Sequence, residues 1–204
     1  DGNTAFETCP YNQDEKKRIA IKGFELAMKR KKKLCCVDKA NVLESSRLWR
    51  ETFQEMEKDF PDVKVSYEFV EAVAMRLVQW PNSYDVLVTG NLFGDILTDE
   101  ASVISGSMGL MPSASVGEEN ALYEPIHGSF PEAAGLGIAN PLATILSAAM
   151  MFEMSFGLHH EGANIREVVN KSVAEGKVTK DLAGKGENFL STSEVGDYLL
   201  ELIR

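Results

Sequence analysis

Hydrophobic and polar positions follow two different periods along the first 90 residues. Apolar side chains recur at helical spacing in some segments and form short runs typical of strands in others. The elements that this pattern predicts are helices over 14–33, 41–60 and 70–80 and strands over 34–37, 63–67 and 84–89. Pro61 and Pro81 end the second and third helices. Such alternation of helix and strand predicts an α/β fold with a largely parallel sheet.

The pattern changes after residue 90. Eight of the 16 glycines lie between Gly90 and Gly137, where they allow tight turns and close approach of the backbone to a ligand. A loop-rich connector between two domains is an equally good interpretation of this stretch. Beyond it, apolar periodicity predicts helices over 141–156, 165–175 and 193–203.

Composition and charge narrow the class of protein. With 44% hydrophobic residues the 204-residue chain can bury a sizeable core, and it has no apolar run of about 18 residues that would predict a membrane span. The net charge of −10 disfavours a nucleic-acid partner, and the basic run 29–33 suits the negative end of a helix. Three cysteines do not make a disulfide framework. We therefore expect a cytoplasmic protein without nucleic-acid or membrane partners.

Asp95 and Asp99 directly follow the predicted buried strand at 84–89. A spacing of four places both carboxylates on one face of a helix, where like charges repel each other. A hard divalent cation such as Mg²⁺ or Mn²⁺ would relieve this repulsion, and the carboxyl ends of strands are where ligands gather in open α/β sheets. Acidic residues favoured by the positive end of the helix explain the spacing equally well.

Four motifs in the same order resemble the β-decarboxylating dehydrogenases, the family of the isocitrate and isopropylmalate dehydrogenases. They are AFETCPY at 5–11, VDKANVL at 37–43, YDVLVTGNLFGDILTDEAS at 84–102 with GSMGLMPSAS after it, and YEPIHGS at 123–129. Phe93 and the segments 99–102 and 112–115 are more similar to the isopropylmalate branch than to the isocitrate or tartrate branches.

The resemblance implies roles for individual residues around the reaction. Asp95 and Asp99 match the metal ligands of the family, and Lys39 matches the lysine that takes part in proton transfer at the substrate hydroxyl. Tyr11 matches the tyrosine that protonates the enol after carbon dioxide leaves. Glu71 stands where the family usually has an aspartate that joins the metal site from the neighbouring subunit. Its additional methylene should change metal affinity rather than abolish function.

The resemblance also implies a cofactor loop. His127, Gly128, Ser129 and Asn140 match the segment that holds the adenosine half of the nicotinamide cofactor. Glu132 falls where NAD-using members carry an acidic residue, usually aspartate, facing the adenosine ribose. A carboxylate accepts hydrogen bonds from ribose hydroxyls and repels the additional phosphate of NADP, so we expect NAD as the cofactor.

The implied fold has two open α/β domains sharing a cleft, with the N-terminal part absent from this sequence. Residues 1–105 would belong to the central, dimer-forming domain and 106–204 to the returning half of the nucleotide-binding domain. The implied reaction is the NAD- and metal-dependent oxidative decarboxylation of 3-isopropylmalate in leucine biosynthesis, by a homodimer that shares its active sites. Tartrate or malate, isocitrate and homoisocitrate are alternative substrates, and a non-catalytic subunit is an alternative of another class. We expect these 204 residues alone to fold poorly and to be inactive.

Overall fold

A computed structural model describes residues 2–203 of the chain. The chain divides into two compact units, the first up to Ala101 and the second from Ser102 onward. The predicted boundary after residue 105 refers to domains of a longer protein and stays a prediction. None of the described helices has the length and apolar character that crossing a membrane requires.

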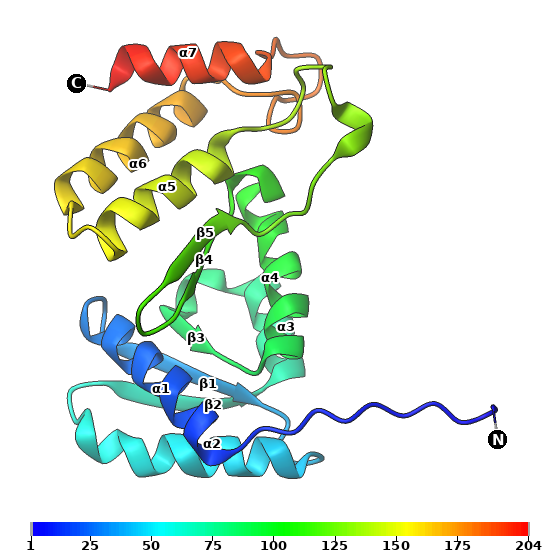
Figure 1. Ribbon diagram of the computed structural model, residues 1–204, viewed down its shortest axis with the longest axis vertical. Coiled ribbons are helices and arrows are strands. Elements are labelled where there is room, and N and C mark those ends of the chain that lie inside the picture. Colours follow the sequence, from blue (N-terminus) through cyan, green and yellow to red (C-terminus); the bar gives the residue numbers. More distant parts are fainter. Residues whose placement is uncertain (1, 204) are drawn as a thin grey trace. The chain divides into compact units, whose positions relative to one another are not determined.

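The first unit is a three-stranded parallel sheet with helices on both faces (Figure 1). The strand order is β2-β1-β3, so the central strand is the first in sequence. The elements are α1 (Gln13–Met28), β1 (Lys33–Asp38), α2 (Glu44–Met56), β2 (Lys64–Phe69), α3 (Val70–Gln79), β3 (Val86–Val88) and α4 (Asn91–Ser105), whose last four residues belong to the second unit, with 3₁₀ turns at Glu57–Asp59 and Pro81–Ser83.

Alternate side chains of β1 enter two separate cores, as the period of a strand requires. Leu34 and Cys36 pack in a cluster with side chains of α1 and α2, which cover one face of the sheet. Cys35 and Val37 pack on the other face in a cluster with residues of α3 and α4. Gly23 of α1 lets the helix approach β3, because a Cβ there would lie 2.4 Å from Cγ2 of Val88.

Two predicted boundaries of the first unit were wrong. The first helix ends at Met28 rather than at Lys33, because Lys32 adopts φ 56° and its amide donates to the carbonyl of Ala27. This turn starts β1 at Lys33. Strand β3 starts later than expected because the amide of Tyr84 donates to the carbonyl of Pro81 in the preceding 3₁₀ turn.

The second unit packs helices on a two-stranded antiparallel hairpin. Helix α5 contacts both hairpin strands and α6, and α6 contacts α7. The core contains Leu142, Val168, Val169, Val195 and Leu199. The elements are η3 (Met108–Leu110), β4 (Pro112–Val116), β5 (Ala121–Pro125), η4 (Pro131–Ala133), α5 (Leu142–Met154), α6 (His159–Ala174) and α7 (Thr192–Leu202).

Two features of this unit escaped the sequence pattern. The glycine-rich stretch contains the β4–β5 hairpin, so it is more than a loop-rich connector. Helix α6 begins at His159, earlier than the predicted start at Ile165. Gly162, which weakens the helical signal, fits where α6 passes α5, because a Cβ there would lie 2.4 Å from Cγ of Glu153.

Candidate functional site

Residues whose side chains could bind a ligand or transfer a proton follow the carboxyl ends of all three parallel strands in the first unit. Lys39 comes directly after β1, Glu71 lies in the first turn of α3 beyond β2, and α4, which carries Asp95 and Asp99, begins shortly after β3. Ligands of open α/β sheets gather at this end of the strands. The topology therefore places these predicted site residues at the same edge of one sheet.

Lys39 and Glu71 contact each other directly. The ammonium of Lys39 donates to Oε1 of Glu71, and its Nζ lies 5.9 Å from the centroid of the Phe69 ring. Both side chains remain accessible, with exposed fractions of 26% and 51%. The hydrogen bond from Lys39 holds the pKa of Glu71 below its ordinary value, so Glu71 is ionised at neutral pH. The predicted proton-transfer residue and a predicted metal ligand are thus neighbours.

A second ion pair lies next to Lys39 and was not predicted. Arg50 of α2 donates from Nε and Nη2 to the carboxylate of Asp38, at 2.8 and 2.9 Å. The Asp38 side chain is 1% exposed and also accepts from the amide of Ala40. The guanidinium lies 5.2 Å from the Phe69 ring centroid, and its hydrogen bond with Asp38 raises the pKa of Arg50. Asp38 therefore fixes the backbone on both sides of Lys39.

Asp95 and Asp99 both lie on α4, which confirms the helical conformation that their spacing requires. Both are exposed, one turn apart. Their carboxylate oxygens are suitable ligands for Mg²⁺ or Mn²⁺. Among the described residues no group of three or more His, Cys, Asp or Glu could hold a metal ion, so Glu71 does not join the two aspartates within this chain. The metal site remains a prediction.

Tyr11 lies immediately before the Asn12 cap of α1. Its side chain is 38% exposed and lines a cavity of ≈ 330 Å³ that Lys16 and Phe93 also line. A side-chain hydrogen bond with Cys9, reinforced by burial, raises the pKa of Tyr11 above its ordinary value. The phenol therefore keeps its proton at neutral pH, as a proton donor must.

A larger cavity, of ≈ 740 Å³, lies in the second unit. Four of the predicted cofactor residues line it, namely His127, Gly128, Ser129 and Asn140. Its volume falls in the range of about 300–1,000 Å³ that is typical of ligand sites, so it has space for part of a dinucleotide. Glu132 lies on η4 beside the cavity and is exposed, but it is not among the described residues that line it. Its contact with a ribose therefore stays a prediction.

Asp181 accepts several hydrogen bonds at this second cavity, and the sequence pattern did not identify it as a site residue. Its carboxylate accepts from Ser107 at 2.5 Å, from Thr179 at 2.5 Å and from Nδ2 of Asn140 at 2.9 Å. Burial alone would raise the pKa of Asp181, but these hydrogen bonds outweigh it and lower the pKa. Gly109 packs against the same amide, since a Cβ there would lie 2.6 Å from Cβ of Asn140.

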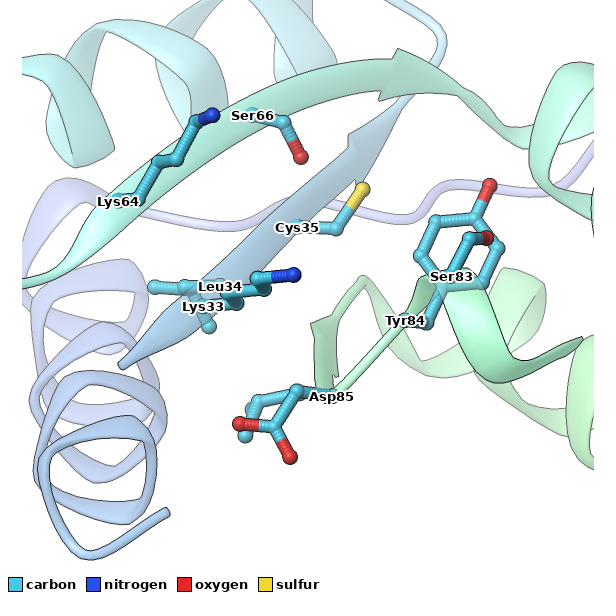
Figure 2. Close-up of a pocket in the computed structure, with 9 residues that line it drawn as sticks. Lys33, Leu34, Cys35, Lys64, Ser66, Ser83, Tyr84 and Asp85 are labelled. Atoms are coloured by element: carbon cyan, nitrogen blue, oxygen red, sulfur yellow. The ribbon is translucent and has the colours of Figure 1, made fainter. Parts of the chain in front are cut away.

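The amino ends of the strands hold a smaller cavity, of ≈ 180 Å³, with the side chains shown in Figure 2. Cys35 is buried there between Ser66 and Tyr84 (Figure 2), and burial raises the pKa of its thiol to about 11. The hydroxyl of Tyr84 donates to Glu68 at 2.8 Å, and Asp85 accepts from Arg30 and from the amide of Lys31, both at 2.9 Å. This end offers a protonated thiol and paired polar groups, not a reactive centre.

Known sequences place the chain in a family. The family model described as isocitrate/isopropylmalate dehydrogenase matches residues 1–199. The 3-isopropylmalate dehydrogenase of Nitratidesulfovibrio vulgaris is 51% identical over 201 residues, which are 98% of this chain and 56% of that protein. The 3-isopropylmalate dehydrogenase of Bacteroides fragilis is 53% identical over 204 residues, 100% of this chain and 58% of that protein. The chain thus spans little more than half the length of these curated relatives.

Solved structures agree with the family model. Isocitrate dehydrogenase from Methylococcus capsulatus superimposes with a TM-score of 0.91 at 36% identity, covering 97% of this chain and 58% of that one. A β-decarboxylating dehydrogenase from Thermococcus kodakarensis gives 0.87 at 35% identity, covering 98% and 58%. The predicted α/β fold is confirmed, as part of the full-length fold. This chain belongs to the isocitrate/isopropylmalate dehydrogenase family.

Proposed function

We propose that the protein containing this chain catalyses the oxidative decarboxylation of 3-isopropylmalate with NAD and Mg²⁺ or Mn²⁺. The observation that carries the proposal is the placement of Lys39, Glu71, Asp95 and Asp99 after the carboxyl ends of the three parallel strands. The names of the relatives from N. vulgaris and B. fragilis favour this substrate over isocitrate or tartrate.

The residues of this chain perform the proton transfers in the proposed reaction. Lys39, whose side chain is 26% exposed, first releases the proton of its ammonium to solvent; the neutral amine then accepts the proton of the substrate hydroxyl at Nζ, and Glu71 holds that amine in place through its carboxylate. After carbon dioxide leaves, Tyr11 donates the proton of its hydroxyl to the enol carbon, for which its raised pKa keeps the phenol protonated. A metal held by Asp95 and Asp99 would polarise the oxygens of the substrate, and bound NAD would supply the hydride acceptor.

A homodimer completes the proposed site. Within the described chain Glu71 pairs with Lys39 and does not gather with Asp95 and Asp99 into a metal-binding group. Two aspartates one turn apart leave most coordination positions of Mg²⁺ or Mn²⁺ to other ligands. Glu71 and Lys39 of a second copy supply the missing carboxylate and the proton-transfer amine in this proposal, so the sheet edge of each chain contributes its aspartates to one site and its Lys39–Glu71 pair to the other.

The cofactor-binding role rests on the larger cavity. Its lining presents the ring of His127, the hydroxyl of Ser129 and the amide of Asn140, which suit the hydrogen-bonding edges of an adenosine. A Cβ at Gly128 would meet nothing within 4 Å, so this position is open toward a ligand. Glu132, exposed beside the cavity, favours NAD because its carboxylate would repel a 2′-phosphate.

Steady-state kinetics of the full-length protein test the proposal. Turnover of 3-isopropylmalate, isocitrate, tartrate, malate and homoisocitrate is compared with NAD and with NADP, each with Mn²⁺ present. We expect the highest kcat/KM with 3-isopropylmalate and NAD. Faster turnover with NADP at equal concentration would refute the cofactor assignment, and cofactor binding without any turnover would indicate a non-catalytic subunit.

A further inference from the structure

The cavity beside Tyr11 has features that the proposed proton transfers do not use. It is lined from five segments of the first unit: the chain before α1, α1 itself, the end of β1, the start of α2 and the start of α4. Its volume of ≈ 330 Å³ is enough for a small organic molecule. Most of the lining is apolar, through Val37, Leu43, Trp49, Leu92 and Phe93.

Lys16 is the exception in this lining. The residue is 2% exposed, and its Nζ is buried without a hydrogen-bond partner among the described residues. Burial lowers the pKa of Lys16, against the opposing effect of Glu15. The Glu15 carboxylate is already engaged, because it accepts the amide of Asn12 at 2.8 Å in the capping box of α1. A buried amine without a partner is costly to the fold unless a ligand completes it.

The position of Lys16 on α1 makes the amine more unusual. Tyr11 is the residue before the Asn12 cap, and Lys16 is the fourth residue of the helix. Apolar side chains at these two positions commonly pack against each other at the start of a helix. Both side chains line the same cavity. An apolar residue at position 16 would therefore satisfy the packing, whereas Lys16 brings a donor and a positive charge, with almost no accessible surface of its own, into the packing around an otherwise apolar cavity.

Two helix starts give the cavity a further preference for negative charge. Leu43, the N-cap of α2, makes no side-chain capping hydrogen bond, and α4 begins at Asn91; both residues line the cavity. The first amides of a helix favour anions through the helix dipole, although the amide of Ser46 in α2 already donates to the carbonyl of Leu43. Glu7 is the one carboxylate among the described lining residues, and it lies exposed on the segment before α1.

We propose that this cavity binds a small aliphatic monocarboxylate, whose carboxylate is held by the Lys16 ammonium and the Tyr11 hydroxyl and whose alkyl part packs on Trp49 and Phe93. The positive charge and the helix start without a side-chain cap favour the carboxylate, and the apolar lining favours the alkyl part. The choice of a six-carbon branched acid rests on the proposed function, which yields a 2-oxo acid of that carbon skeleton. Lys16 is thereby a carboxylate-binding residue next to the proton donor.

Binding measured without turnover tests this inference. The full-length protein, without metal or NAD, is titrated calorimetrically with 4-methylpentanoate and with its uncharged isostere 4-methylpentanamide. The same titrations are made on Lys16→Met, which keeps the length and apolar stem of the side chain. The matched control is Lys22→Met, because Lys22 is an exposed lysine of the same helix.

We expect the acid to bind the wild type and Lys22→Met equally, and Lys16→Met about tenfold or more weakly. The amide should bind the wild type as weakly as the acid binds Lys16→Met. Absence of acid binding to the wild type, equal binding of acid and amide, or unchanged binding to Lys16→Met would overturn the inference. If Lys16→Met fails to fold, the acid–amide comparison on the wild type decides. A protein that binds the acid but does not oxidise 3-isopropylmalate would refute the proposed function alone.

Discussion

The two ends of the parallel sheet use similar polar residues in different ways. At the amino end, Asp85 is held by Arg30 and Lys31, Tyr84 by Glu68, and the Cys35 thiol is buried. At the carboxyl end, Asp95 and Asp99 are exposed and the Lys16 amine has no hydrogen-bond partner among the described residues. Polar groups at the amino end are thus paired or buried, whereas the two aspartates at the carboxyl end are exposed to solvent.

This difference has a physical cost. A polar group that a ligand will complete lowers the stability of the unliganded protein, since its desolvation is not repaid internally. At the carboxyl end the Asp38–Arg50 pair, with a buried carboxylate and a guanidinium side chain that is 27% exposed, lies beside the accessible Lys39–Glu71 pair. The first pair fixes the backbone, and the second presents its side chains to solvent. Substitutions at the two ends should therefore separate activity from stability.

Replacing Lys39 should have the largest effect on activity. Lys39→Met removes the proposed proton acceptor, and we expect kcat to fall by about 10² to 10⁴-fold in steady-state assays of the full-length protein. The matched control at the amino end is Lys33→Met, which should leave kcat within about twofold of the wild type. Similar losses in both variants would contradict the distinction between the two ends.

The aspartates of α4 should control metal affinity. Asp95→Asn and Asp99→Asn each remove a charged ligand, so the Mn²⁺ concentration for half-maximal activity should rise by more than about 100-fold, beyond the effect of a residue that only supports a ligand. Asp85→Asn at the amino end should leave the Mn²⁺ dependence unchanged. Glu71→Asp restores the usual family residue at this position; equal Mn²⁺ affinity and activity in that variant would show that side-chain length is immaterial there.

Arg50 should matter for stability more than any exposed ion pair. Arg50→Met leaves the Asp38 carboxylate buried without its guanidinium, and we expect the free energy of unfolding to fall by about 3–5 kcal/mol in urea titrations of the full-length protein. Arg47→Met is the control on the same helix, because Arg47 pairs with the exposed Glu44 and donates to the carbonyl of Ala40 in an exposed hydrogen bond. Its effect should stay within about 1 kcal/mol.

Replacing Lys16 should raise the free energy of unfolding, whereas replacing Arg50 should lower it. Lys16→Met removes a buried amine that has no partner in the unliganded chain, so the free energy of unfolding should rise by about 1 kcal/mol or more. Lys22→Met, at an exposed position, should change it by less than about 0.5 kcal/mol. Destabilisation by Lys16→Met at neutral pH without ligand would mean that the amine makes a favourable internal contact.

Asp181 should give the smallest effect, a loss of stability that is present at neutral pH and disappears in acid. Its folded-state pKa lies below the ordinary value, so its contribution to stability is present above that ordinary value and is lost as the pH falls through the folded-state pKa. Asp181→Asn should therefore flatten the fall in stability below about pH 4, measured by thermal unfolding across pH. An unchanged acid profile would show that the hydrogen bonds to Asp181 do not favour its ionised form.

The sequence pattern predicted the alternating elements of the first unit because burial on both faces of β1 leaves a continuous apolar run. It also placed Asp95 and Asp99 on one helix, since a spacing of four depends on local geometry alone. The pattern did not predict the Asp38–Arg50 and Asn140–Asp181 hydrogen bonds, because these join residues 12 and 41 positions apart in the sequence. The pattern did not predict the burial of Lys16 either, because a lysine in the first turns of a helix is expected to be exposed and only the packing of α1 shows that it is buried.

The measurement that tests the account most directly is the turnover of 3-isopropylmalate by the full-length protein, followed by the release of reduced nicotinamide cofactor and carbon dioxide. The account predicts equal amounts of both products, formed only when the acid, NAD and Mg²⁺ or Mn²⁺ are all present, and nearly abolished in Lys39→Met. Turnover that proceeds equally well in Lys39→Met, or a folded protein that oxidises none of the tested 2-hydroxy acids, would contradict the assignment of the carboxyl end of the sheet as the active site.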